Sequence, residues 1–118
     1  MPTMTDAAAN KALADQGALF VQLHTADPTD AGTAAVSVGL PTRVAAALSV
    51  AAGRARTNPA DIAWPAGTTV AETITHLSLW TAATGGACQW RGPLVAAKPV
   101  ALGEKFKLAA GDLDLTID

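Results

Sequence analysis

The chain has 118 residues, a net charge of -2 and a single cysteine, and 15% of its residues are charged. This length is typical of one domain with its own core, and one cysteine excludes an intrachain disulfide and a multi-cysteine metal cluster. The eight basic residues are scattered, no apolar run reaches the ~20 residues that span a bilayer, and the N-terminus lacks a secretory signal. We therefore expect no nucleic-acid or membrane partner, and a protein that is made in the cytoplasm.

Residues 1–17 are predicted to form an N-terminal helix or arm. Thr5 or Asp6 is suited to cap a helix that runs to Asp15, and Gly17 follows its end. Leu13 is the one large aliphatic side chain in this stretch. The helix is therefore expected to lie on another surface instead of forming a core of its own.

From residue 18 onward the apolar pattern has a period of two, which indicates β-strands. Residues typical of turns separate the strands, notably at 56–59 and 109–112. The predicted strands are 18–24, 43–50, 61–64, 72–80, 87–91, 94–97, 104–108 and 113–117, with Pro65 ending the third and Pro93 separating the fifth from the sixth. Seven or eight short strands predict an all-β fold, a single antiparallel, jelly-roll-like β-sandwich over residues 18–118.

The stretch LWTAATGGACQWRGPL, residues 79–94, is predicted to form a hairpin. A three-residue loop at 84–86 would place Trp80 directly opposite Trp90, with Gly86 in the left-handed conformation and Cys88 opposite Ala82. Cys88 is then a small buried apolar residue. The residues expected to form the hairpin and the core are Trp64, Trp80, Gly85, Gly86 and Trp90.

Two histidines, His24 and His76, are candidates for catalysis. A hydrolase would pair one of them with Ser78 or Ser49 and with a carboxylate such as Asp27. Neither histidine has the sequence context of a nucleophile elbow or a zinc helix, so both are interpreted as structural. We expect no enzyme activity.

Metal and cofactor sites are also not expected. Asp27, Asp30 and Gly32 resemble a calcium loop faintly, but acids in such a loop more often bond their own backbone. The C-terminal acids Asp112, Asp114 and Asp118 alternate with Leu113, Leu115 and Ile117, which is typical of a strand with one solvated face. No glycine-rich phosphate motif is present in the sequence.

Four segments together resemble a known family. They are VQLHTADPTDAG (21–32), RTNPADIAWPAG (56–67), THLSLWTAATGGACQWRGPL (75–94) and KPVALGEKFKLAAGDLDLTID (98–118). This combination is similar to small virion proteins of tailed bacteriophages and prophages, commonly called tail fibre or minor structural proteins. The chain departs from the family pattern at Thr81, where the family has aspartate, at Trp64, where it has phenylalanine, and before Arg43, where it has an aromatic residue.

The resemblance implies a non-enzymatic structural protein of the virion. Because one compact domain does not extend far, we expect a capsid decoration protein that binds the major capsid protein and stabilises the shell. A homo-oligomer, by analogy a trimer, is expected. The alternatives are a tail-associated protein and, less favoured, a carbohydrate-binding domain whose three tryptophans form an exposed platform. Candidate partner contacts are Thr5, Leu13, Asp27 and Asp30.

Overall fold

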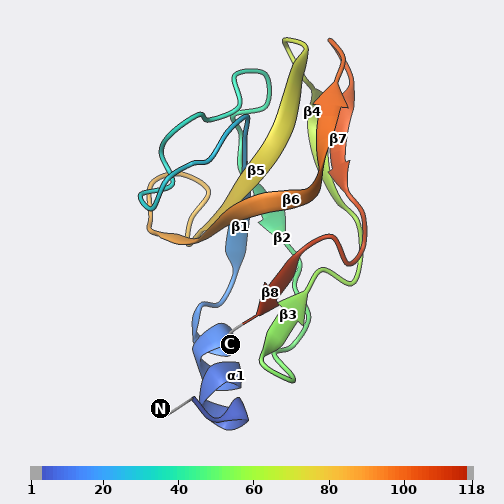
Figure 1. The fold of residues 1–118 in the computed structure, drawn as a ribbon. Helices are drawn as coiled ribbons and strands as arrows, with labels where there is room; N and C mark the ends of the chain where they lie inside the picture. Colours follow the sequence, from blue (N-terminus) through green and yellow to red (C-terminus); the bar gives the residue numbers. More distant parts are fainter. Residues whose placement is uncertain (1–3, 117–118) are drawn as a thin grey trace.

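The computed structural model describes residues 4–116, and it is an all-β fold with one short helix (Figure 1). Its elements are α1 (Asp6–Asp15), β1 (Leu19–His24), β2 (Val44–Ala46), β3 (Ala55–Thr57), β4 (Ile62–Gly67), β5 (Glu72–Trp80), β6 (Cys88–Val100), β7 (Lys105–Leu108) and β8 (Asp114–Thr116). The predicted all-β, sandwich-like fold is confirmed.

The strands form one larger sheet and two ribbons, all antiparallel. The larger sheet has the order β2-β1-β5-β6, and the ribbons pair β3 with β8 and β4 with β7. In the larger sheet Val21 lies opposite Leu79 and Leu23 opposite Leu77. Because side chains alternate along a strand, this register gathers aliphatic residues on one face of the β1–β5 pair.

The core lies between the larger sheet and the two ribbons. Trp64 of β4 packs edge-to-face on Phe106 of β7, with ring centroids 5.2 Å apart and an interplanar angle of 84°. Leu113 and Leu115 cover another part of the core from the β8 side. Leu13 of α1 is fully buried in the same cluster, so the helix does contribute to the core.

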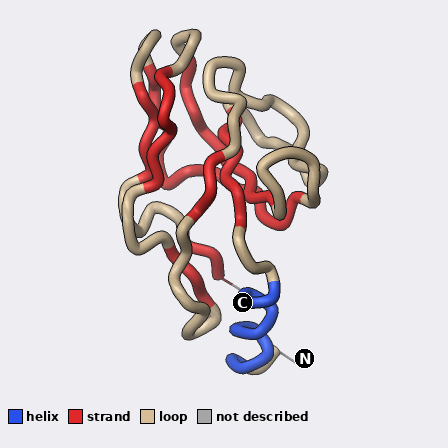
Figure 2. Tube along the Cα trace, turned by 180° about the vertical axis from the view of Figure 1, so that it is seen from behind, coloured by secondary structure: helices blue, strands red, loops and turns tan. Residues whose placement is uncertain are grey.

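The molecule is elongated, with principal extents of 47 × 27 × 25 Å. Figures 1 and 2, which show opposite sides, place α1, β3 and β8 at one end of the long axis. The loops after β4 and before β7 lie at the other end, beside a loop that precedes β2 (Figure 1). The fold therefore has two distinct ends, and the larger sheet lies between them.

Several strand boundaries differ from those predicted. Strand β2 spans three residues instead of eight, because a run of alanines offers little side-chain surface to hold a longer strand at a sheet edge. Strand β4 continues through Pro65 to Gly67 with a register shift against β7. Strand β6 runs unbroken through Pro93, since on an edge strand a proline without N–H need not remove a ladder hydrogen bond.

The segment 56–59 was predicted to be a turn, and its first two residues instead belong to β3. Thr57 pairs with Asp114 across 57 residues of sequence, a contact that local turn chemistry does not reveal. The turn begins at Asn58, which is fully buried. Its side chain donates to the carbonyls of Ala60 and Ala109 and accepts from the N–H of Leu113.

The predicted hairpin register is wrong. Trp80 lies opposite Cys88, and Trp90 lies opposite Leu79, with a register shift between the two pairs. The loop is longer than three residues, because the N–H of Thr81 donates to the carbonyl of Ala87 at 3.1 Å and the turn lies between them. The two tryptophans therefore fall on different faces of the sheet. Gly86 does adopt the predicted left-handed conformation, with φ 74°, and so does Gly85.

Candidate functional site

A buried polar chain connects β1 and β5 at the sheet face opposite the aliphatic one. His24 donates from Nδ1 to the carbonyl of Ala34 at 2.8 Å, since a carbonyl can only accept. Its Nε2 then accepts from the hydroxyl of Ser78 at 2.7 Å, and that oxygen accepts from Trp80 Nε1 at 2.8 Å. Burial lowers the pKa of His24 below its usual value, which favours the neutral ring.

The structure thus brings together His24 and Ser78, two residues that the sequence offered for hydrolysis, but in an arrangement unsuited to catalysis. Both side chains are 0% exposed, so no substrate reaches the serine oxygen. His24 Nδ1 bonds a backbone carbonyl in place of a carboxylate, and Asp27 instead pairs with Arg91. His76 bonds the neighbouring hydroxyl of Thr75. The chain of hydrogen bonds is therefore a structural element.

Arg43 holds the hairpin loop against this buried chain. Its guanidinium lies over the Trp80 ring, 4.0 Å from the centroid. Nη1 donates to the carbonyls of Ala82 at 2.9 Å and Gly85 at 2.6 Å, near the turn of the loop. A cation stacked on an aromatic ring and bonded to two carbonyls fixes the loop in one position.

Asp27 and Asp30 lie on an exposed loop and face Arg91 of β6. Arg91 Nη1 is 3.3 Å from Asp27 Oδ1, and Nε is 3.9 Å from Asp30 Oδ1. Asp27 also accepts from the N–H of Thr29 at 2.9 Å, the backbone bond expected of a loop acid. Within residues 4–116, no group of three or more His, Cys, Asp or Glu side chains is placed to hold a metal ion.

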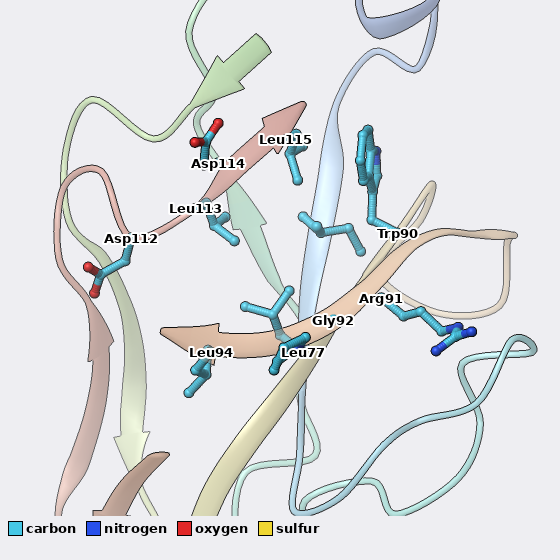
Figure 3. Close-up of a pocket in the computed structure, with 11 residues that line it drawn as sticks. Leu77, Trp90, Arg91, Gly92, Leu94, Asp112, Leu113, Asp114 and Leu115 are labelled. Atoms are coloured by element: carbon cyan, nitrogen blue, oxygen red, sulfur yellow. The ribbon is translucent and has the colours of Figure 1, made fainter. Parts of the chain in front are cut away.

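A small apolar groove of about 210 Å³ lies between β6 and β8 (Figure 3). Leu77, Leu113 and Leu115 face its interior, and Trp90 lies beside Leu115. The guanidinium of Arg91 points away from the groove at the right of Figure 3. Alternation of acidic and aliphatic residues along 112–116 is as predicted, with Leu113 and Leu115 buried. Ile117 and Asp118 lie outside the described residues.

Arg54, in the turn before β3, and Arg56 of β3 hold the two ends of α1. At the start of the helix, Arg54 donates from Nε to Asp6 at 2.6 Å and from Nη2 to the carbonyl of Met4. Arg56 donates from Nη1 to the carbonyls of Leu13 and Gly17, each at 3.2 Å, at its end. Helix carbonyls near the C-terminus lack partners within the helix, so a cation there is stabilising. Arg54 and Arg56 therefore have a structural role.

The remaining residues of the predicted set are placed as follows. Thr5 caps α1 by accepting from the N–H of Ala8 at 3.2 Å. Leu13 is 0% exposed, so a partner does not reach it in this conformation. Trp64 and Trp80 are 2% and 7% exposed, and Trp90 donates from Nε1 to Gln16 at 2.6 Å. With two of its three members buried, the tryptophan set forms no exposed platform for a sugar.

The geometry is that of a binding or structural module, and the comparison with known families agrees. Residues 3–116 match the model of a family described as podophage GP4 fiber I protein gp80. The chain belongs to this family of phage fibre proteins. It is therefore a phage structural protein and a virion component. The family description favours the tail-associated alternative over the predicted capsid decoration. No curated protein matches the chain.

In the described part of the chain, no helix has the length and apolarity that crossing a membrane requires.

Proposed function

We propose that the protein is a non-enzymatic building block of a phage tail fibre. The observation that carries this proposal is the family match, which extends over nearly the whole chain and whose description names a fibre. The resemblance of four sequence segments to tail fibre and minor structural proteins agrees with this match.

The chemistry of the chain supports a structural role. The histidine–serine pair is sealed from solvent, and the Arg54, Arg56 and Arg43 side chains all bond backbone carbonyls of their own chain. These contacts fix the helix and the hairpin loop in place. Rigid surfaces of this kind suit repeated protein–protein contacts.

Two surfaces are proposed as contacts to other virion proteins. The first is the exposed loop with Asp27 and Asp30, whose side chains are held toward Arg91. The second is the groove between β6 and β8, whose apolar floor fits an aliphatic side chain of a partner. Association of three copies remains a prediction that a mass measurement of the purified protein tests.

The proposal is tested by the position of the protein in the particle. Purified virions are separated into heads and tails, and the protein is quantified in each by mass spectrometry against the major capsid protein. We expect the protein in the tail fraction, in far fewer copies per particle than the major capsid protein. Recovery with the heads, in numbers that follow the capsid protein, would contradict the proposal and favour shell decoration.

A further inference from the structure

The loop after β1 carries backbone strain. We call residues 25–36 the flap; they lie between β1 and β2, and Val36 returns to form an antiparallel bridge with His24 (Figure 1). Three non-glycine residues among those described have a positive φ, and two of them lie in the flap, Thr29 at 67° and Ala35 at 53°. Side chains rarely adopt this left-handed conformation, least of all β-branched ones. Contacts elsewhere must therefore hold the flap in this shape.

Few apolar contacts hold the flap on the sheet. Pro28 and Gly32 are its buried residues, and the others are half-buried or exposed. Gly32 packs against the β5–β6 pair so closely that an added Cβ would lie 2.5 Å from Cys88 Sγ and 3.0 Å from Cζ2 of Trp80. A segment with so little buried apolar surface opens at a lower free-energy cost than the core of the domain.

Polar contacts at the base of the flap supply the rest of its attachment, and His24 is central among them. Nδ1 of His24 donates to the carbonyl of Ala34 at 2.8 Å, next to the strained Ala35. Nε2 accepts from the hydroxyl of Ser78 on β5 at 2.7 Å. His24 is 0% exposed, and neither of these partners is a carboxylate. The neutral ring thus connects the flap to the sheet.

The charged and titratable side chains around His24 do not favour a protonated ring. They are His76 and Glu72 of β5, Arg91 of β6, Asp27 and Asp30 of the flap, and Arg43 before β2. His76 lies directly opposite His24 in the β1–β5 register, where its proton would add a second positive charge. The two aspartates face Arg91, Glu72 accepts from Ser37, and Arg43 lies over the Trp80 ring. Burial lowers the pKa of His24 most, the hydrogen bond to Ala34 partly offsets this, and His76 lowers it further.

Protonation of His24 leaves two groups unfavourably placed under the closed flap. The ring would carry a positive charge where water is excluded, and the Ser78 hydroxyl would lose its acceptor, because a protonated Nε2 donates. Displacement of the flap brings water to the ring and releases Thr29 and Ala35 from the left-handed conformation. It breaks no strand pairing of the larger sheet, since residues 25–36 lie outside its strands. Opening of the flap is therefore less costly than unfolding of the domain.

We propose that the flap is a pH-sensitive element, closed while His24 is neutral and displaced from the sheet when His24 is protonated. In the displaced state the carboxylates of Asp27 and Asp30 no longer face Arg91, so acid changes the surface that this loop offers to another virion protein. That consequence rests on the proposed function of the loop as a contact, whereas the opening itself rests on the contacts of this chain alone.

The size of the effect follows from the two protonation equilibria. Under the displaced flap His24 is hydrated and its pKa is near the ordinary value of 6.5, whereas burial holds the pKa lower under the closed flap. The closed flap is therefore fully favoured above pH 6.5 and loses stability as the pH falls below that value. Each further pH unit raises the opening constant up to about tenfold, which gives a rise of up to about 30-fold at pH 5.

Hydrogen exchange followed by NMR tests the flap. The N–H groups of Thr25, Gly32 and Ala34 each donate to a carbonyl within the flap, at 3.0 to 3.1 Å. Their protection factors, corrected for the intrinsic exchange rate at each pH, should fall by up to about 30-fold between pH 7.5 and pH 5, while the amides of the β1–β5 pair keep theirs. Unchanged protection of the flap amides, or an equal fall in flap and sheet, would overturn the proposal.

Two variants assign the effect to His24. His24→Gln has a neutral side chain at every pH, so the protection of its flap amides should not change between pH 7.5 and pH 5. His76→Gln is the matched control, because position 76 is the cross-strand neighbour of His24, and this variant should retain the fall. A fall that persists in His24→Gln, or one that is lost in His76→Gln, would show that His24 does not control the flap.

The thiol of Cys88 gives a second measurement that needs no variant. Gly32 of the flap packs on its sulfur, so the reaction of Cys88 with 4,4′-dithiodipyridine, measured relative to free cysteine at the same pH, should become faster as the pH falls from 7.5 to 5. This measurement decides the test if circular dichroism shows that His24→Gln does not fold. A relative rate that stays constant or falls would count against an opening flap.

These results separate the two proposals. An acid-opened flap in a protein that fractionates with heads would refute the fibre function and leave the pH-sensitive element intact. Flap protection that does not depend on pH, in a protein found in tails, would refute the pH-sensitive element and leave the fibre function intact.

Discussion

Replacement of Ser78 by alanine tests the buried polar chain between β1 and β5. The serine hydroxyl is the shared partner of His24 Nε2 and Trp80 Nε1, at 2.7 and 2.8 Å. Ser78 and His24 are 0% exposed, and Trp80 is 7% exposed, so water does not readily replace the lost oxygen. Every buried side-chain nitrogen and oxygen within the described residues has a partner, and the substitution would leave two without one.

The expected loss of stability follows from those two groups. A buried polar group left without a partner costs about 1–3 kcal/mol, so with two such groups Ser78→Ala should lower the free energy of unfolding by about 2–6 kcal/mol. This is a large part of the ~5–15 kcal/mol that stabilises a typical domain. The loss is larger than expected for removal of one hydroxyl, because His24 Nε2 and Trp80 Nε1 both lose their hydrogen-bond partner.

Urea unfolding followed by tryptophan fluorescence measures the loss, with Ser49→Ala as the matched control. Ser49 is half-buried and its hydroxyl accepts a single hydrogen bond, from the N–H of Thr57 at 3.0 Å. The control should lose about 0.5–1.5 kcal/mol. A Ser78→Ala loss equal to or smaller than that of the control would refute the reasoning that two buried groups depend on this hydroxyl.

Three further predictions concern pH, the hairpin loop and the helix clamp. Burial lowers the pKa of His24, so near pH 6.5 the unfolded chain binds a proton that the folded protein does not. The free energy of unfolding should therefore be highest above that pH and fall as the pH drops below it. In His24→Gln the urea midpoint should lose this part of the pH dependence. Gly85→Ala should cost about 1–2 kcal/mol from its left-handed backbone. Gly86→Ala should cost more in the same unfolding assay, since its added Cβ would also lie 2.7 Å from the Thr81 hydroxyl oxygen, and equal losses would contradict this. Arg56→Lys should speed hydrogen exchange of the α1 amides, because one ammonium does not reproduce the guanidinium contacts, and unchanged exchange would show that the clamp is not needed.

Local patterns predicted the elements whose signal lies within a few residues. Strand β5 matches the alternation of 72–80 at both boundaries, and α1 begins after Thr5, one of the two predicted caps. The turn at 109–112 closes as expected, with the N–H of Asp112 donating to the carbonyl of Ala109 at 3.0 Å. Hydrogen bonds between near neighbours decide the helix cap and the turn, whereas β5 is marked by the alternation of its own side chains.

Features that depend on distant contacts were not predicted. The pairing of β3 with β8 joins segments about 60 residues apart, and no residue type marks it. The hairpin register depends on Arg43, 37 positions before Trp80, which stacks on that ring and bonds the loop carbonyls. The contacts of Arg54 and Arg56 with carbonyls at the two ends of α1 also join segments about 40 to 50 residues apart, so the sequence does not reveal them.

The class of function was also predicted from the sequence, but the position in the virion was not. The four sequence segments predicted a phage structural protein, and the family match confirms that class. The preference for a capsid position came from the size of one compact domain, an argument that treats each copy as isolated. The family description, which names a fibre, favours the tail-associated alternative over that argument.

Cryo-electron microscopy of the intact virion tests the central claim most directly. The account predicts density at a tail fibre that fits the 47 × 27 × 25 Å domain. Density for the domain at symmetry-related sites on the capsid shell, and none in the fibres, would contradict it.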